Sequence, residues 1–397
     1  MRTLMSLLLA LFVFAVPTAT VFAQDAGDPP AVFCGNLSDD DCALLEESAA
    51  MMADLTEASY VSYFDFDISG IPETPFDEIA GDITETGSFI VDEALQAELK
   101  AMQPEDYLAA MEDQTALQEM VTAVVNGIDT AQMIEINLNS ELADLLSAEV
   151  GYPIPESMTL RFVITGGEGY INLDDLSAIV PEMGEMSGWV GTELGPVLEY
   201  AFSQMNLETD ASSLAPAGQA MALASPKAKV ALLGDYMDVT ASEDTLDGED
   251  VMVFDTTIDF AGFLTSPEFL QFVIDQVEAS GQGSISESDL AQIQMFMPMI
   301  GPMLAGGLNA GSTQYVSLDS GYTLLEESTF EWDLSSLMGM LSMTGAVPAP
   351  PAGASTFIGF NASTAHSDFN DVGEIPAPEN AMFVPGDAVV GMLESSQ

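Results

Sequence analysis

The stretch EDTLDGEDVMVFDTTIDF, residues 243–260, decides how the rest of the chain is interpreted. It is crowded with carboxylates, yet its apolar residues alternate as in a half-buried strand. The pair Asp247-Gly248 separates two alternating runs, which is a strong signal for a β-hairpin. In the second run Phe254 and Phe260 share one face, and Asp255 lies on the other. The stretch therefore predicts structural strands whose acids mainly face water, and it does not indicate an acidic active site.

The same alternation recurs along most of the chain. In SYVSYFDFDIS, residues 59–69, it places Tyr60, Phe64, Phe66 and Ile68 on one face. Further strands are predicted at 82–92, 131–139, 157–165, 313–334 and 355–369, and helices at 39–58, 104–125, 268–277 and 284–307. Strands outnumber helices and follow one another closely along the chain. We therefore expect an α+β fold with a curved antiparallel sheet, a half-barrel, closed on one face by helices.

The charge balance excludes several classes of partner. The 397 residues include 64 Asp and Glu but only 5 Lys and Arg, which gives a net charge of −59. Nucleic acid is excluded, because phosphate binding requires clustered cationic side chains. An anionic membrane surface would repel the folded protein for the same reason. The remaining candidates are an apolar, neutral or cationic ligand, together with calcium or other cations held at low affinity.

The N-terminal residues have the pattern of an export signal. Arg2 precedes an apolar run from Leu4 to Val16, and VFA at residues 21–23 predicts cleavage after Ala23. No later apolar run is long enough to predict a transmembrane span. We therefore expect residues 1–23 to be a signal peptide and the protein to be exported to the periplasm, cell surface or extracellular space. Residues 24–58 would form a cysteine loop and helix, continuous with a single large half-barrel domain at 59–397.

The two cysteines, Cys34 and Cys42, lie in CGNLSDDDC. In an exported chain this spacing favours a local disulfide. Lipidation of Cys34 is the alternative, although Phe33 stands where a lipoprotein signal has a small residue. No metal site is expected from two cysteines alone.

The sequence carries no motif of a known catalytic centre. His366 is the only histidine, and the polar, turn-like segment STAHSDF predicts that it is an exposed loop residue. The Asp-Ser-Gly triplet in LDSGY, residues 318–322, has the context of a plain turn. A pair of carboxylates could in principle act as a glycosidase, but with 64 acids such pairs arise by chance. We therefore expect a protein that is not an enzyme, with no catalytic residues and no cofactor.

Methionines gather in the segment MFMPM, residues 295–299, and at Met303. Three interpretations stay open. The thioethers could fill an apolar core, they could bind Cu(I), or they could form an adaptable lining for an apolar ligand.

In order along the chain, several segments resemble those of a known family. They are ALLEESAAMMADLTEASYVSYFDFDI (43–68), GYINLDDLSAIVPEMGEMSGWV (169–190), YMDVTASEDTLDGEDVMVFDTTIDFAGFL (236–264) and STAHSDFNDVGEIPAPENA (363–381). The chain is similar to LolA-like lipoprotein carriers and to the related LppX/LprG-type lipid-binding lipoproteins. This resemblance implies a half-barrel whose apolar cavity shelters acyl chains. The chain departs from the family in its length, in its lack of a lipoprotein signal and in its scarcity of cationic residues.

The resulting functional hypothesis is an exported binding protein with an apolar pocket for a lipid or an acyl chain, with a lipoprotein as a further candidate partner. The predicted pocket residues are Phe64, Phe66, Phe254, Phe260, Met295, Phe296, Met299 and Met303. The alternative is a structural or surface-interaction protein with a filled core and weak cation binding.

Overall fold

The structure is a computed structural model. It describes residues 32–71, 76–101, 114–177, 187–204, 232–269, 305–344 and 355–395, together with Gln271 and Gly301. The predicted signal peptide and the predicted pocket residues Met295, Phe296, Met299 and Met303 lie outside the described residues. The proposed boundaries at 24–58 and 59–397 stay a prediction.

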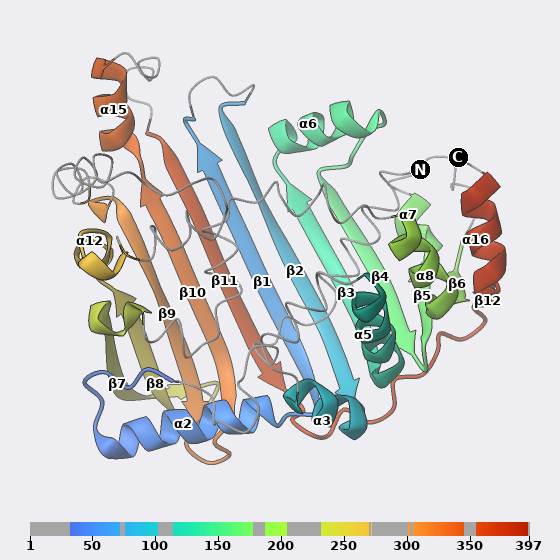
Figure 1. Ribbon diagram of the computed structural model, residues 1–397, viewed down its shortest axis with the longest axis horizontal. Coiled ribbons are helices and arrows are strands. Elements are labelled where there is room, and N and C mark those ends of the chain that lie inside the picture. The colour runs from blue at the N-terminus through green and yellow to red at the C-terminus, as the bar shows by residue number, and fades with distance from the viewer. Residues whose placement is uncertain are drawn as a thin grey trace.

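The described strands form one open, curved sheet of 12 strands (Figure 1). Their order is β12-β6-β5-β4-β3-β2-β1-β11-β10-β9-β8-β7, and all neighbours are antiparallel except β12 and β6. The strands are β1 Glu57–Ser69, β2 Glu78–Val91, β3 Ile128–Leu138, β4 Ser157–Thr165, β5 Glu168–Asn172, β6 Trp189–Glu193, β7 Met237–Leu246, β8 Glu249–Ile258, β9 Leu308–Ser317, β10 Thr323–Asp333, β11 Phe357–Ser367 and β12 Met382–Phe383. Strands β1 to β6 form one meander and β7 to β11 form another. The pairing of β1 with β11 joins the two into a single sheet.

The hairpin predicted from residues 243–260 is present. Strands β7 and β8 pair without a register shift from Leu246↔Glu249 to Met237↔Ile258. Asp247 and Gly248 connect them with φ values of 53° and 94°. Positive φ at both central residues defines a type I′ turn, whose twist matches that of the flanking strands. This is why the Asp-Gly pair is a reliable signal.

The described helices lie on one face of the sheet and at the ends of its strands (Figure 1). They are α2 Asp39–Ala53, α3 Glu93–Ala101, α5 Gln114–Gly127, α6 Ser140–Val150, α7 Leu173–Ser177, α8 Leu194–Gln204, α12 Phe260–Leu264, α15 Ser335–Thr344 and α16 Gly386–Ser395. Helices α5 and α8 pack on Ile164 of β4. Helix α7 packs on Leu160 of the same strand. Helix α2 lies across the other half of the sheet, where its Leu45 contacts Phe254 and Val316 (Figure 1). The predicted α+β half-barrel closed on one face by helices is confirmed.

Alternate residues along each strand point to opposite faces of the sheet. In β1, Tyr60, Phe64 and Phe66 lie on the face that carries the helices, which we call the helix-covered face. Tyr63 and Asp65 lie on the opposite, outer face. The β1 ladders to β2 and β11 run without register shifts, so this alternation continues unbroken along the strand. The face assignment of Tyr60, Phe64, Phe66 and Ile68 from the sequence is therefore confirmed.

The two cysteines form a disulfide, as predicted. Cys34 and Cys42 are bonded with a Cα–Cα distance of 5.3 Å, and the described residues contain no free cysteine. The bond closes a short loop over the start of α2, where the Ser38 side chain accepts a hydrogen bond from the Asp41 amide. Disulfides are typical of proteins that fold in oxidising compartments. A bonded Cys34 sulfur cannot carry a lipid, so the lipidation alternative is not supported.

Two sequence expectations need correction. Phe260 was expected on the strand, but β8 ends at Ile258 and Phe260 begins α12. The reason is Asp259, whose side chain accepts a hydrogen bond from the Gly262 amide and so caps the helix. His366 was expected in an exposed loop, but it lies within β11 opposite Tyr60, and its Nδ1 atom is buried.

In the part of the chain that the structure describes, every helix is too short or too polar to cross a bilayer.

We predict that replacing Cys34 and Cys42 by serine lowers the free energy of unfolding by about 2.5 kcal/mol. The bond spans a sequence separation of 8 and removes loop-closure entropy from the unfolded chain. Urea unfolding of the variant and of the wild type, each with and without reductant, measures the effect. The variant should be insensitive to reductant, and an acyl group on Cys34 in the intact mass of the wild type would contradict the bond.

Candidate functional site

An aromatic patch lies on the helix-covered face at the middle of the sheet. We use this name for Phe64 and Phe66 of β1, Phe330 and Trp332 of β10, and Phe360 of β11. The ring centroids of Phe64 and Phe360 are 6.1 Å apart, and those of Phe330 and Phe360 are 5.9 Å apart. Phe66 and Trp332 extend the patch at either side, 6.1 Å from Phe64 and 6.5 Å from Phe330. The five rings therefore form one continuous surface across three adjacent strands.

The aromatic patch stays accessible although it lies at the centre of the sheet. Phe64 is 37% exposed, and the other four side chains are half-buried. By contrast, Phe254 on the same face is 1% exposed under α2. Large aromatic side chains at the centre of a covered sheet face are normally buried. The aromatic patch is thus apolar surface that the described residues leave partly exposed.

A polar band borders the aromatic patch. It consists of residues that face one another directly across five strands: Gln314, Glu326, Thr364, Ser62 and Glu85. Gln314 donates a hydrogen bond to Glu326 at 3.2 Å, and the Ser62 and Thr364 hydroxyls are 3.0 Å apart. Tyr60 donates to Glu85 at 2.5 Å. Ala362 and Ser328, both small, lie between the polar band and the rings of Phe360 and Phe330. The surface is therefore amphipathic, with polar groups next to the rings.

Burial shifts the pKa values of the titratable groups in and beside the polar band. It raises the pKa of Glu326, and it raises the pKa of Glu85 against the opposing effect of the hydrogen bond from Tyr60. The Tyr60 hydroxyl has its pKa raised by burial and by the negative charge of Glu85. His366 lies next to this band on β11, opposite Tyr60, and burial lowers its pKa. Among the described residues, its Nδ1 atom has no hydrogen-bond partner. In all four groups the loss of water makes the charged form more costly.

The two carboxylates of the polar band do not form a catalytic pair. Glu85 and Glu326 are separated by β1 and β11, which corresponds to three strand spacings, or about 14 Å. Glycosidases place their carboxyl groups at about 5 to 9.5 Å. These two groups therefore act separately.

The structure brings together part of the predicted site. Phe64 and Phe66 lie in the aromatic patch. Phe254 packs in the core with Leu45 and Val316, and Phe260 lies half-buried at the start of α12. Sequence analysis missed Phe330, Trp332 and Phe360. The alternation in β10 and β11 indicates which residues share a face, but it does not indicate which strand pairs with β1. Alternating aromatic residues are visible in the segments TFEWDL and FIGF. The pairing of β1 with β11 is what places these rings beside Phe64.

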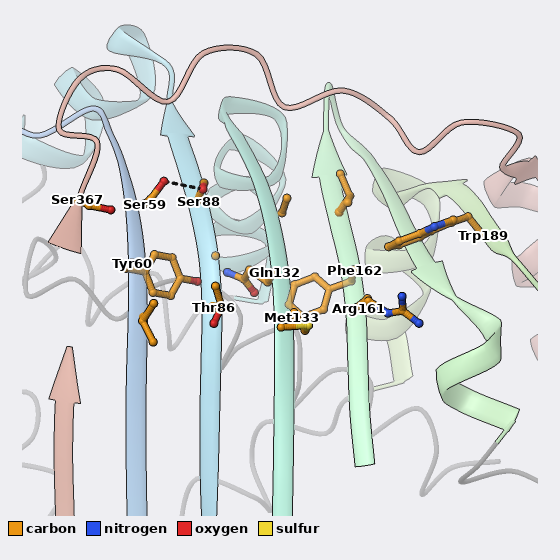
Figure 2. Close-up of a pocket in the computed structure, with 14 residues that line it drawn as sticks. Ser59, Tyr60, Thr86, Ser88, Gln132, Met133, Arg161, Phe162, Trp189 and Ser367 are labelled. Atoms are coloured by element: carbon orange, nitrogen blue, oxygen red, sulfur yellow. Dashed lines mark hydrogen bonds between the residues drawn. The ribbon is translucent and has the colours of Figure 1, made fainter. Parts of the chain in front are cut away.

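A concave surface lies on the outer face. It is a groove of about 530 Å³. Its lining residues are Ser59, Tyr60, Val61, Thr86, Gly87, Ser88, Ala131, Gln132, Met133, Arg161, Phe162, Val163, Trp189 and Ser367. Figure 2 shows Ser59, Ser88 and Ser367 at one end and Arg161 with Trp189 at the other. Of the predicted pocket residues that the structure describes, Phe64, Phe66, Phe254 and Phe260, none lines this groove.

The C-terminal strap, our name for residues 368–381, runs past the groove in Figure 2. Ile375 of the strap packs with Val163 and Tyr170 of the outer face. At the far end Arg161 donates to Asp175 at 2.7 Å and 3.0 Å, so its charge is already balanced. The groove offers hydroxyl groups and apolar surface without a net charge.

Comparisons with known proteins do not assign the chain to a family. No family model and no curated protein matches it. Among solved structures, one similar chain is a DUF1329 family protein from Desulfovibrio piger ATCC 29098, with 10% identity and a TM-score of 0.17. The match covers 85% of this chain and 96% of that chain. At this TM-score the similarity supports no conclusion, and the function must be argued from the surfaces described above.

We predict that two phenylalanines on the same face respond differently to truncation. Phe254→Ala should lower the free energy of unfolding by about 3 to 5 kcal/mol, because it leaves a cavity beneath α2. Phe64→Ala should lower it by about 1 kcal/mol, because the ring is already partly in water. Denaturant unfolding measures both. Equal losses would contradict the accessibility of the aromatic patch.

We predict a pH-dependent effect of Glu326→Gln. A raised carboxyl pKa means that the folded chain binds this proton more tightly than the unfolded chain, so the stabilisation is present at low pH and is lost as pH rises through the folded-state pKa. Removing the carboxylate should therefore stabilise the protein more at pH 8 than at pH 4. Urea unfolding at both pH values tests this, with Glu327→Gln on the outer face of the same strand as the matched control. An effect independent of pH would show that Glu326 is not desolvated.

Proposed function

We propose that the protein is an exported, non-enzymatic binding protein that holds the apolar part of a lipid, or of a lipoprotein acyl chain, against the aromatic patch. The observation that carries this proposal is the accessibility of five aromatic side chains at the centre of the helix-covered face. Contiguous apolar surface of this kind usually marks a binding site.

The energetics are sufficient for a carrier. Each methylene group removed from water contributes about 0.8 kcal/mol, so a dodecyl chain contributes about 10 kcal/mol before the costs of association. The costs of association offset a large part of this free energy, so the expected dissociation constants lie in the micromolar range. Such affinities suit a carrier, which must release its ligand as well as bind it.

Two further observations support the proposal. The resemblance to LolA-like and LppX/LprG-type carriers implies a curved antiparallel sheet with helices over one face, and the fold of this chain is compatible with that expectation. The Cys34–Cys42 disulfide fits folding outside the cytoplasm. Membership of that family and export itself are part of the proposal. A filled-core structural protein is the alternative, and it predicts no ligand.

The chain contains two tryptophans, one on each face, and they make the test specific. Trp332 belongs to the aromatic patch and Trp189 lines the outer groove. In a Trp189→Phe variant, titration with dodecanol should give a saturable, blue-shifted change in Trp332 emission. In a Trp332→Phe variant, Trp189 should not respond. Organic extracts of the exported protein should contain lipid.

A matched pair of neighbours provides the control. Phe64→Ser should weaken dodecanol binding by about tenfold, which corresponds to the lost contact of one aromatic ring. Tyr63→Ser, the adjacent residue at 41% exposure on the outer face, should leave binding unchanged. The absence both of a Trp332 response and of extracted lipid would overturn the proposal in favour of a filled core.

A further inference from the structure

The polar band carries information about the ligand that the aromatic patch alone does not. Within the described residues the cationic side chains are Lys100 and Arg161, and the other three of the chain's five fall outside them. Lys100 is paired with Asp54 at 2.5 Å, and Arg161 is paired with Asp175 at 2.7 Å. Neither belongs to the aromatic patch or to the polar band. The described lining therefore offers an anionic head group no cation.

The same lining offers two carboxylates with spare capacity to accept hydrogen bonds. A carboxylate has about four acceptor positions. Within the part of the chain that the structure describes, Glu326 accepts one hydrogen bond, from Gln314, and Glu85 accepts one, from Tyr60. Both side chains are half-buried, so an unpaired charge there is costly and a cationic partner is favoured. The two are about 14 Å apart, so they are separate acceptor sites and not an acidic cluster.

The distance between polar band and aromatic patch suits a single amphiphilic molecule. Phe64 follows Ser62 of the polar band by two residues on β1, which corresponds to about 7 Å. Phe330 follows Glu326 by four residues on β10, which corresponds to about 13 Å. A head group at the band would thus place its alkyl chain over the rings. Aromatic rings also attract a cation directly, which adds to the effect of the carboxylates.

We propose that the ligand is a cationic amphiphile, with its ammonium group at the polar band and its alkyl chain on the aromatic patch. This inference rests on the proposed function and narrows it to one head-group chemistry. Fatty acids and anionic phospholipids would place a negative charge beside Glu85 or Glu326 in a protein of net charge −59. They are therefore bound more weakly than a neutral amphiphile of the same chain length.

Three ligands with the same chain test the inference: dodecylamine, dodecanol and dodecanoate, each titrated into the Trp189→Phe protein at neutral pH with Trp332 emission as readout. Dodecylamine should bind at least about tenfold more tightly than dodecanol, because one charge-assisted hydrogen bond supplies that difference. Dodecanoate should bind more weakly than dodecanol. Circular dichroism checks that each variant below is folded.

The variants distinguish a local effect from general attraction to an acidic surface. Glu85→Gln with Glu326→Gln should remove the advantage of dodecylamine over dodecanol, because the amide side chains carry no charge to pair with the ammonium group. The control, Asp82→Asn with Glu327→Gln, removes the same number of charges from the same two strands on the outer face, and it should keep the advantage. If the advantage survives in the first double variant, the attraction is global and the inference is wrong.

The outcomes separate this inference from the proposed function. Saturable dodecanol binding with no preference for the amine, or a preference for dodecanoate, overturns the head-group assignment and leaves the apolar binding site standing. No Trp332 response to any of the three ligands overturns both.

Discussion

The antiparallel pairing of β1 with β11 is the interaction on which the rest of the structure depends. It runs from Ser59↔Ser367 to Ser69↔Phe357 and joins segments from opposite ends of the chain. Without it the two meanders would each expose a sheet edge, and Phe64 would have no contact with Phe360. Contacts of such large sequence separation form only after much of the chain has collapsed, because loop closure must come first. The candidate site therefore depends on a long-range step of assembly, and no local segment contains it.

This dependence explains what the sequence could and could not predict. Alternation assigned the faces of Tyr60, Phe64 and Phe66, and the Asp247-Gly248 turn fixed the register of its hairpin, because both signals are local. The partners of Phe64 could not be predicted, since they depend on strand order. His366 was misassigned because polar neighbours in STAHSDF resemble a turn, whereas Tyr60 and Phe369 surround it in three dimensions. The proposed role of residues 295–303 stays a prediction from the sequence.

Across the described residues, the acidic side chains are accommodated with only two ion pairs. On the outer face, carboxylates accept hydrogen bonds from neutral donors: Asn361 to Asp65, Asn137 to Asp82, Thr313 to Asp255 and Tyr315 to Glu327. Neutral donors satisfy the oxygens but do not cancel their charge. Mutual repulsion among carboxylates is therefore left to be screened by dissolved ions. The carboxylates of the outer face and those of the polar band thus differ in their exposure to water, although all of them belong to Asp or Glu side chains.

The path of the C-terminal strap has a consequence for the ends of the sheet. The strap carries the chain from β11, at the centre, to β12, which pairs in parallel with β6 for only Met382 and Phe383. Such a short terminal strand offers an incoming chain little backbone to pair with. At the other end, β7 carries Asp238, Glu243 and Asp244, whose like charges oppose a second copy. An open sheet of this width can therefore remain a discrete particle and resist growth into a fibre.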